Sequence, residues 1–528
     1  MKDLTKKVLC LILLITIIAV ACASLVSCKD DSDKDDPNAL PPQLDPIDDN
    51  YRVFYQIFVG SFSDSNGDGI GDLRGIINRF DYLNDGNINS GKSLGVQGIW
   101  LSPIFKSPTY HKYDCTDYYQ IDEKFGTMDD LMELIELCHA RNVKIILDLV
   151  LNHTSLENEW FQRFILARAG EQTENPYYDF YSTSTTNSWA RYQNIIYECN
   201  FDSGMPELNY DSELVKETML NVAKHYLEMG IDGFRFDAIK YIYYNEMGKN
   251  IDFWNWYMSE LRKIKPDIYT VGECWSGDGE VEQYYTALNC FNFTTSQAEG
   301  YIASAVKNGR ISFFTNYLVN HLNNIKAKRS DAMYMPFLAN HDMDRAAGFL
   351  QVSLGDAYMA ANLYILCSGS PTIYYGEEIG MKGTRAGSNT DANRRLAMLW
   401  GDGDTVRDPS GSTFDKSKQL NGTVKDQLDN ENSLLNYYAK VIAMRNKYPE
   451  IARGDYQVIK SDSIYVGGFK ITYNDSTIGL IHNTDRNETI SIPLPQGFTS
   501  IADYIGFGTC SIENGMLLIG PQTTVIIK

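Results

Sequence analysis

From Gly233 to Asp237 the chain reads Gly-Phe-Arg-Phe-Asp, in which aromatic and charged side chains alternate. A period of two predicts a β-strand that carries both phenylalanines on one face and Arg235 and Asp237 on the other. An arginine beside an aspartate keeps the carboxyl group ionised, because the positive charge stabilises the carboxylate. This strand therefore ends in a candidate nucleophile.

Similar short runs recur along the chain, and helical periodicity at Met128–Ala140, Ser212–Glu228 and Trp254–Ile264 separates them. Strands that alternate with helices predict an α/β fold, a (β/α)8 TIM barrel. The expected barrel strands are Val53–Val59, Gly98–Leu101, Lys144–Leu149, Gly233–Phe236, Tyr269–Gly272, Met333–Leu338 and Thr372–Tyr375, with the remaining one near Leu288–Phe293.

Two segments interrupt the barrel pattern. Residues 152–209 are rich in Tyr, Asn, Ser and Thr and are too long for an ordinary loop, so they predict a small domain inserted after the third strand. Residues 455–528 contain short alternating runs separated by turns, which predict a C-terminal antiparallel β-sandwich. The barrel itself is expected over residues 51–151 and 210–454.

The overall composition excludes several classes of protein. The 528 residues are 44% hydrophobic and 22% charged, which is typical of a globular protein with a large core. Lys and Arg number 47 against 68 Asp and Glu, so the net charge is −21. Because an acidic surface repels phosphates, nucleic acid is not expected as a partner.

The N-terminus predicts export. A basic start precedes an apolar run from Val8 to Val20, which has the layout of a secretory signal and is shorter than the roughly 20 residues of a membrane-spanning helix. Leu25-Val26-Ser27-Cys28 resembles the lipobox of bacterial lipoproteins. The resemblance implies a signal peptide over residues 1–28 and lipidation of Cys28; an ordinary cleaved signal with an incidental cysteine is the alternative.

Residues 29–50 form an acidic and then proline-rich stretch, whose charge density predicts a disordered tether. Its beginning, Lys29-Asp30-Asp31, resembles the surface-export signal of Bacteroidetes lipoproteins. That resemblance implies a lipid anchor in the outer membrane with the protein facing the cell surface.

Polar residues also follow three other expected strands. Glu273 lies between Gly272 and the apolar Cys274-Trp275, an environment that raises a carboxyl pKa and suits a general acid. Asn152-His153 and Asn340-His341-Asp342 complete the set. Each motif alone is more often a helix cap or a turn. Together they lie where TIM barrels place active sites, at the carboxyl ends of the strands.

These four segments resemble the signature regions of the α-amylase family, glycoside hydrolase family 13. Three further segments resemble the family's fifth region, its first-sugar loop and its strand-eight segment, namely Met205-Pro206-Glu207-Leu208-Asn209, Tyr110–Asp114 and Ser370–Glu378. By resemblance, Asp237 is the nucleophile, Glu273 the acid/base and Asp342 the transition-state stabiliser. The substrate-binding residues implied are His111, Tyr113, His153, Arg235, Lys240, His341 and Arg345.

Between Asp64 and Asp72 oxygen-bearing side chains recur at alternate positions, with glycines between them. Such oxygens are the ligands that Ca²⁺ prefers, although Gly75 at position twelve excludes an EF-hand. A solvated turn is the alternative interpretation. Because the resembling family carries a loop of this kind, a Ca²⁺ cofactor is expected, with ligands Asp64, Asn66, Asp68, the Ile70 carbonyl and Asp72.

The resemblance implies a retaining, endo-acting α-1,4-glucan hydrolase that degrades starch and maltooligosaccharides. Ala238 after the nucleophile favours the 1,4 bond, because members specific for 1,6 bonds commonly have valine there. Lys240-Tyr241 replaces the family's Lys-His, which leaves the product pattern open. The alternatives are a neopullulanase, an oligo-α-1,6-glucosidase or transglycosylase, and a non-enzymatic starch-binding lipoprotein. At the cell surface, other glycan-uptake proteins are expected partners.

Overall fold

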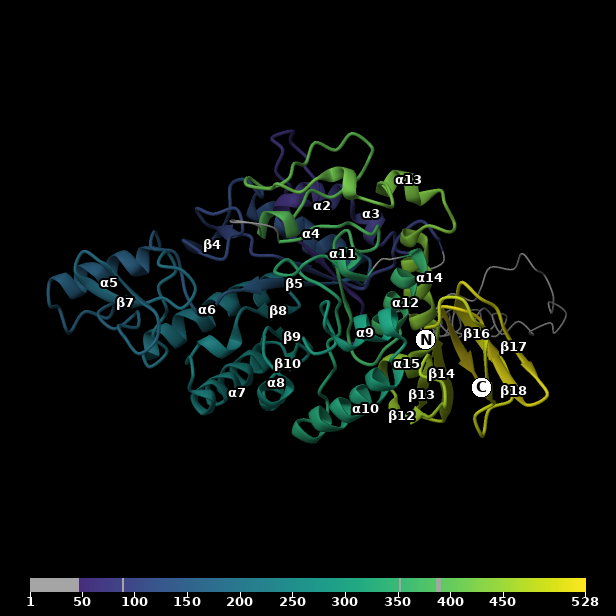
Figure 1. Cartoon of the computed structure of the whole chain (residues 1–528). Helices are drawn as coiled ribbons and strands as arrows, with labels where there is room; N and C mark the ends of the chain where they lie inside the picture. Colours follow the sequence, from purple (N-terminus) through teal and green to yellow (C-terminus); the bar gives the residue numbers. More distant parts are fainter. Residues whose placement is uncertain (1–46, 88–89, 351–352, 386–390) are drawn as a thin grey trace, which may run out of the picture. The chain divides into compact units, whose positions relative to one another are not determined.

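The computed structural model describes residues 47–87, 90–350, 353–385 and 391–528. The predicted signal peptide, Cys28 and most of the predicted tether therefore lie outside the described residues. Figure 1 shows strands β5, β8, β9 and β10 side by side, with helices α6, α7 and α8 outside them.

The centre of the molecule is a parallel sheet in the order β10-β9-β8-β5-β2-β1-β11. All of its neighbouring strands run parallel, for example β1 with β2 and β5 with β8. Four strands begin and end where the sequence predicts, and three are shorter than expected. The strands are β1 (Phe54–Ile57), β2 (Gly98–Leu101), β5 (Lys144–Leu149), β8 (Gly233–Phe236), β9 (Tyr269–Gly272), β10 (Asn289–Cys290) and β11 (Thr372–Tyr374).

The predicted strand Met333–Leu338 is not a regular strand, which corrects the sequence analysis. Single parallel bridges pair Met335 with Phe291 and Phe337 with Thr372, so the segment still closes the sheet between β10 and β11. Pro336 lies between the two bridges. A proline has no N–H to donate to a ladder, so pairing there is interrupted. The eight-stranded parallel barrel is thus confirmed, and one of its eight strand positions is occupied by this irregular segment.

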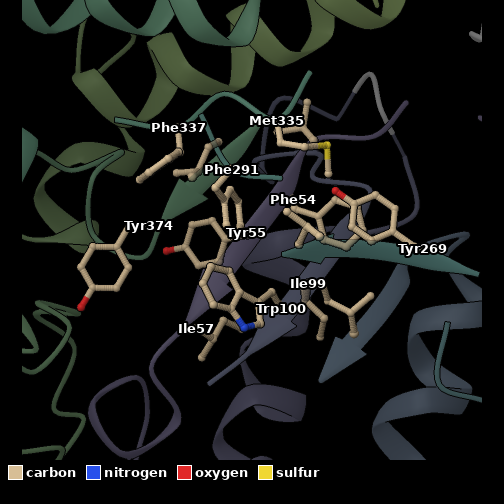
Figure 2. Packing of buried hydrophobic residues seen from close by; sticks show 14 of the residues in the cluster. Phe54, Tyr55, Ile57, Ile99, Trp100, Tyr269, Phe291, Met335, Phe337 and Tyr374 are labelled. Atoms are coloured by element: carbon tan, nitrogen blue, oxygen red, sulfur yellow. The ribbon is translucent and has the colours of Figure 1, made fainter. Parts of the chain in front are cut away.

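Aromatic side chains fill the barrel interior (Figure 2). The ring of Phe54 stacks on Tyr269 with 4.2 Å between centroids, and Trp100 stacks on Phe291 at 5.5 Å. Gly98 makes room for this packing, because a Cβ atom there would lie 2.5 Å from the Phe54 ring. The interior is therefore a packed core that supports the residues above it.

The helices surround this sheet. Thr127 and Asp130 form a capping box at the start of α4, and the left-handed Gly230 ends α6. Helix α7 starts earlier than predicted. The helices are α2 (Leu73–Asn78), α3 (Phe80–Leu83), α4 (Met128–Ala140), α5 (Glu159–Ala169), α6 (Glu213–Met229), α7 (Met247–Ile264), α8 (Asp278–Tyr284), α9 (Tyr301–Asn308), α10 (Ile311–Lys328), α11 (Ala346–Leu350), α12 (Leu354–Ile365), α13 (Val424–Leu428), α14 (Leu434–Lys447) and α15 (Pro449–Arg453).

The segment between β5 and α6 contains α5 and the antiparallel hairpin of β6 (Trp189–Tyr192) and β7 (Ile195–Glu198). Its apolar centre is aromatic, with the ring of Phe161 5.1 Å from Tyr181 and 5.2 Å from Tyr197. A second hairpin, formed by β3 (Phe105–Lys106) and β4 (Asp117–Ile121), follows β2.

The C-terminal residues form two antiparallel sheets, in the orders β12-β13-β14-β19-β16 and β15-β18-β17. Both sheets contribute to one apolar cluster that includes Ile481, Ile492 and Leu517. No helix of the described residues is long and apolar enough to cross a membrane. The strands are β12 (Asp455–Ile459), β13 (Val466–Tyr473), β14 (Ser476–Asn483), β15 (Ile490–Pro493), β16 (Ile501–Gly506), β17 (Cys510–Glu513), β18 (Met516–Ile519) and β19 (Thr523–Ile527).

Candidate active site

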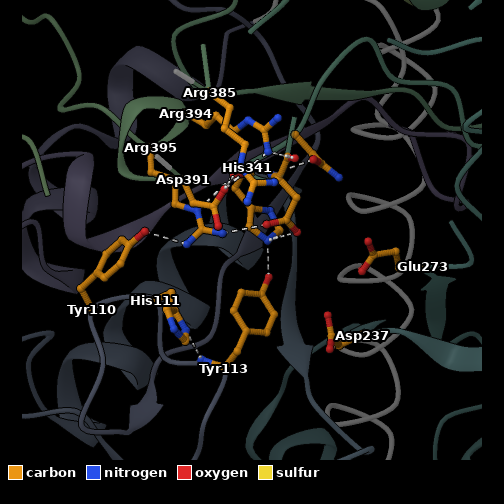
Figure 3. A network of polar contacts seen from close by, with 12 residues as sticks. Tyr110, His111, Tyr113, Asp237, Glu273, His341, Arg385, Asp391, Arg394 and Arg395 are labelled. Atoms are coloured by element: carbon orange, nitrogen blue, oxygen red, sulfur yellow. Dashed lines mark hydrogen bonds and ion pairs between the residues drawn. The ribbon is translucent and has the colours of Figure 1, made fainter. Parts of the chain in front are cut away.

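The carboxyl ends of β8 and β9 bring Asp237 and Glu273 together (Figure 3). Arg235, which is fully buried, donates to both carboxylates: its Nη1 lies 2.7 Å from Asp237 Oδ1, and its Nη2 contacts Glu273 Oε2. One planar guanidinium therefore fixes the orientation of both groups. Both carboxylates line the same cavity.

The two carboxyl groups lie in different electrostatic environments. Burial raises the pKa of Glu273 from 4.5 to about 8, against the opposing effect of Arg235 and helped by Asp237 and Asp342. Glu273 therefore carries a proton at neutral pH and can act as a general acid. The Asp237 carboxylate accepts a hydrogen bond from Arg235, which stabilises its negative charge.

Asp342 belongs to a second ion pair on the opposite wall. Its Oδ1 lies 2.7 Å from Arg395 Nη2 and its Oδ2 lies 3.0 Å from His341 Nε2. Burial alone would raise the pKa of Asp342, but His341 and Arg395 outweigh it and hold the pKa well below its usual range. Asp342 is thus a fixed negative charge that faces Glu273 and Asp237 across the site.

His341 and Tyr113 lie beneath this wall. Their rings stack at 5.4 Å with an interplanar angle of 8°, and Tyr113 Oη lies 2.5 Å from His341 Nε2. The other ring nitrogen of His341 lies 2.7 Å from Gln56 Nε2. Burial lowers the pKa of His341, and the neighbouring Asp342 carboxylate opposes this effect.

Asp148 is a further member of the site that the sequence analysis did not single out, although it lies in the strand that leads to Asn152-His153. Its Oδ1 accepts from Arg235 Nη1 at 2.8 Å, and its Oδ2 accepts from Tyr113 Oη at 3.0 Å. Burial raises its pKa to about 7, against the opposing effect of Arg235. The signal available in the sequence was a charged residue that interrupts the apolar run from Ile145 to Leu151.

A cavity of about 810 Å³ opens above these groups. Phe201 and Trp275 are exposed at its wall, 45% and 43% respectively, and Met205 and Tyr241 lie beside them. Exposed flat rings flanking buried carboxylates match the amphipathic faces of sugar rings, which are apolar above and below and carry hydroxyls at their edges.

Most of the predicted substrate-binding residues line this cavity, namely His111, Tyr113, His153 and Lys240. His153 is buried, and neither of its ring nitrogens has a hydrogen-bond partner among the described residues. A buried imidazole without a partner is costly unless a ligand supplies one. Lys240 donates to the Trp275 carbonyl at 3.0 Å and so holds the loop after Glu273.

Three predicted residues are not among those that line the cavity. Arg235 and His341 are buried and contact carboxylates that do line it, Arg235 those of Asp237 and Glu273 and His341 that of Asp342. Arg345 is buried, donates to the carbonyls of Tyr375 (2.6 Å) and Arg394 (3.0 Å), and packs over aromatic rings, and its substrate-binding role stays a prediction. Arg395 occupies the wall instead, because it pairs with Asp342 and donates to Tyr110 Oη at 2.9 Å.

The loop from Asp64 to Asp72 is ordered by its own side chains. Asp64 Oδ1 accepts the N–H of Asn66 (3.0 Å), and Asp68 Oδ1 accepts the N–H of Ile70 (2.7 Å). Asp72 caps α2 by accepting the Gly75 N–H at 2.6 Å. Across the described residues, no three His, Cys, Asp or Glu side chains converge as a metal site. The donor set is still hard oxygen. Asn66 Oδ1 and Asp68 Oδ1 each accept one N–H and retain a lone pair, whereas each carboxylate oxygen of Asp64 already accepts two hydrogen bonds.

A parallel (β/α)8 barrel with paired carboxyl groups at its carboxyl rim, below a cavity with exposed aromatic rings, has the groups that a glycoside hydrolase requires. Residues 56–454 match the family model described as the alpha amylase catalytic domain. The chain belongs to the α-amylase family, glycoside hydrolase family 13.

Two relatives and one solved structure illustrate the similarity. The chain is 35% identical to Alpha-amylase 3 of Dictyoglomus thermophilum, over 90% of this chain and 93% of the relative. It is 29% identical to the Oligo-1,6-glucosidase of Bacillus cereus, over 90% of this chain and 98% of the relative. Its fold is similar to that of Eubacterium rectale Amy13B, with a TM-score of 0.85 and 34% identity over 94% and 99% of the chains.

The raised pKa of Glu273 makes stability depend on pH. Between about pH 4.5 and 8 the folded protein binds a proton at Glu273 that the unfolded chain does not, so stability falls as pH rises through this window. Glu273→Gln cannot titrate. We expect its Tm relative to that of the wild type to increase by several degrees between pH 5 and pH 9, measured by differential scanning calorimetry.

A matched control is Glu217→Gln, which changes an exposed glutamate of α6. Its Tm should follow the wild type at each pH. A constant difference between Glu273→Gln and the wild type from pH 5 to pH 9 would contradict the assignment of Glu273 as a buried, protonated acid.

Proposed function

We propose that this α-glucan-active enzyme is a retaining, endo-acting α-1,4-glucan hydrolase that acts on starch-like polysaccharides and maltooligosaccharides. The observation that carries the proposal is the pair Asp237 and Glu273, held by one arginine below a cavity that exceeds the volume of a single hexose. Similarity to an α-amylase over nearly the whole chain supports the same assignment.

The proposed reaction uses the two carboxyl groups in turn. Asp237 attacks the anomeric carbon while Glu273 gives its proton to the glycosidic oxygen, so the C–O bond breaks and a covalent glycosyl-enzyme forms. Glu273, now a carboxylate, takes a proton from water, which attacks the anomeric carbon and releases Asp237. The fixed negative charge of Asp342 favours the positive charge that develops on the sugar ring in both steps.

A retaining mechanism needs its two carboxyl groups about 5–5.5 Å apart. The shared guanidinium of Arg235 supports such an arrangement, because its two terminal nitrogens each contact one oxygen of a different carboxyl group. His153 supplies free ring nitrogens for sugar hydroxyls, and Tyr113 offers its ring face. An oligo-1,6-glucosidase, a neopullulanase or a transglycosylase of the same family is the alternative, since one relative has the first of these activities in its name.

The products released from different α-glucans test the substrate specificity. We expect amylose to yield a mixture of short maltooligosaccharides from the first minutes, with pullulan and panose cleaved at least tenfold more slowly. Asp237→Asn and Glu273→Gln should lower the rate by on the order of 10³ or more, because each removes a group needed in both steps. Chromatography of timed digests provides the measurement.

Asp252→Asn, an exposed change on α7, is the control and should keep the wild-type rate. Preferred release of glucose from panose would instead assign the enzyme to the 1,6-specific group. If Glu273→Gln, folded by its melting curve, retained the wild-type rate on starch, the mechanism would be wrong.

We also propose that the loop from Asp64 to Asp72 binds Ca²⁺ through Asp64, Asn66, Asp68, the Ile70 carbonyl and Asp72. Hard oxygens at alternate positions support this choice of ion. The loop packs against residues 404–407: Thr405 donates to Asp64 Oδ2 at 2.7 Å, and the Arg407 N–H donates to the Gly69 carbonyl at 2.9 Å. A bound ion would stabilise this junction.

Removal of the ion should therefore lower stability. An ion that binds only the folded state contributes roughly 2.7 kcal/mol at a hundredfold excess over Kd. We expect EDTA to lower the Tm by a few degrees, added Ca²⁺ to restore it and Mg²⁺ to restore it less, since Mg²⁺ needs a tighter octahedral site.

Asp68→Ala should remove the response to EDTA and the Ca²⁺ binding seen by calorimetry. Asp415→Ala, a change in another exposed aspartate turn, is the matched control and should keep both. Identical melting curves with and without EDTA, for protein shown to be metal-free, would exclude the site.

We propose that the mature protein is anchored by a lipid on Cys28 in the outer membrane and faces the cell surface. The lipobox-like residues Leu25–Cys28 and the acidic segment after them support this location. We expect Cys28→Ala to move the protein from the membrane fraction to the soluble fraction, because the apolar run from Val8 to Val20 is too short to span a bilayer.

Immunoblots of the two fractions provide the measurement, and Cys22→Ala in the same leader is the control that should remain with the membrane. Retention of cleaved Cys28→Ala protein in the membrane fraction would contradict the lipid anchor. Protease treatment of whole cells tests the outward orientation.

A further inference from the structure

A second concave surface lies on the outside of the barrel, between helices α8, α9 and α10. This groove, with a volume of about 600 Å³, shares no lining residue with the catalytic cavity. It is lined by Asp278, Glu282, Tyr301, Ser312, Phe313, Asn316, Tyr317, Asn320, His321 and Asn324. We refer to it as the α10 groove.

One face of α10 forms the length of this groove. Phe313, Asn316, Asn320 and Asn324 follow at spacings of three and four residues, so they lie in a row along the helix. With a rise of about 1.5 Å per residue, the row from Phe313 to Asn324 extends roughly 16 Å. An elongated groove of this kind suits an extended chain more than a compact molecule.

The groove combines an apolar surface with paired donors and acceptors. Phe313 is 56% exposed and lines the groove, so its ring offers an apolar contact surface there. An asparagine amide has two N–H donors and a carbonyl acceptor. This is the chemistry that sugars require, because their ring faces are apolar and each hydroxyl both donates and accepts. Asn316 already donates to the Ser312 carbonyl at 2.7 Å and Asn324 to Glu282 at 3.2 Å, so part of their donor capacity is used within the protein.

Two carboxylates on the opposite side of the groove are held in place. Asp278 Oδ1 accepts from Tyr317 Oη at 2.9 Å, and Glu282 Oε1 lies 3.0 Å from His321 Nδ1. The groove lining contains no lysine or arginine. Phosphates and other acidic polymers are therefore repelled, whereas neutral hydroxyls find ordered acceptors.

The groove is joined to the catalytic rim by a short chain of contacts. Asp278 Oδ1 also accepts from Thr294 Oγ1 at 2.9 Å. Phe293, the preceding residue, stacks at 5.0 Å on Trp275, which lines the catalytic cavity two residues after Glu273. A polymer held in the groove would thus be held close to the loop that carries the general acid.

We propose that the α10 groove is a non-catalytic binding site for an α-glucan chain, with Phe313 as the stacking surface and Asn316, Asn320 and Asn324 as hydrogen-bonding groups. The proposal rests on the proposed function only for the identity of the sugar polymer. The role of the α10 groove is to keep a long substrate at the enzyme surface between cleavage events, which raises the local substrate concentration.

The test uses Phe313→Ala and Asn320→Ala, each alone and combined with Glu273→Gln so that the polymer is not consumed. Electrophoresis through gels that contain soluble starch measures binding to starch. Gels that contain dextran test whether the groove distinguishes the glycosidic linkage of the polymer. We expect each variant to bind starch on the order of fivefold more weakly than its parent. The KM for starch should rise similarly, while kcat/KM for a maltotrioside stays at the wild-type value.

Phe507→Ala is the matched control, because Phe507 has the same exposed fraction, 56%, and lies outside the groove. It should bind starch as its parent does. If the wild type cleaves starch but Phe313→Ala and Asn320→Ala bind and cleave it equally well, the groove proposal is overturned and the hydrolase stands. If the wild type cleaves no α-glucan, the proposed function fails instead, whatever the gels show.

Discussion

The active site depends on one buried cation, the guanidinium of Arg235. It is fully buried and donates to Asp148, Asp237 and Glu273, which come from three different strands or strand ends. A buried charge without partners is destabilising, and removal of one partner from such a cluster typically costs about 3–5 kcal/mol. The barrel strands therefore have to hold all four groups in register, and the same constraint orients the two reacting carboxyl groups.

This arrangement also explains why the acids behave differently. One positive charge cannot neutralise three carboxylates in a dry environment, so protons remain on part of the cluster. Burial raises the pKa of Glu273 to about 8 and that of Asp148 to about 7. Asp342 stays ionised because its own arginine, Arg395, pairs with it. Two arginines thus divide one group of carboxyls into a proton donor and a fixed negative charge.

The cavity and the α10 groove apply related chemistry to different tasks. Around the reacting bond, buried charges set protonation and orientation, and the aromatic rings of Phe201 and Trp275 line the opening. Along α10, exposed amides and one phenylalanine offer contacts to many successive sugars without reacting with them. Trp275, which lines the cavity, stacks on Phe293, and the next residue along the chain, Thr294, contacts Asp278 of the groove. The two regions are therefore connected by neighbouring loops.

The sequence by itself determined the features that depend on residues adjacent along the chain. Period-two and helical patterns located Gly98–Leu101, Lys144–Leu149, Gly233–Phe236 and Tyr269–Gly272 to the residue, because each element is specified by neighbours along the chain. The motifs at the strand ends similarly singled out Asp237, Glu273 and Asp342, which line one cavity in the structure. At Pro336 the apolar pattern predicted a regular strand, but the proline has no N–H to donate and the segment pairs only through single bridges.

The tertiary structure decided which residues, distant along the chain, form ion pairs. Asp342 pairs with Arg395, which lies 53 positions further along the chain, while Arg345, only three positions away, is buried against backbone carbonyls. The part played by Asp148 and the groove between α8 and α10 likewise arise only when separate segments pack together. No spacing rule along the chain encodes these contacts, because Coulomb interactions and burial depend on distance in space.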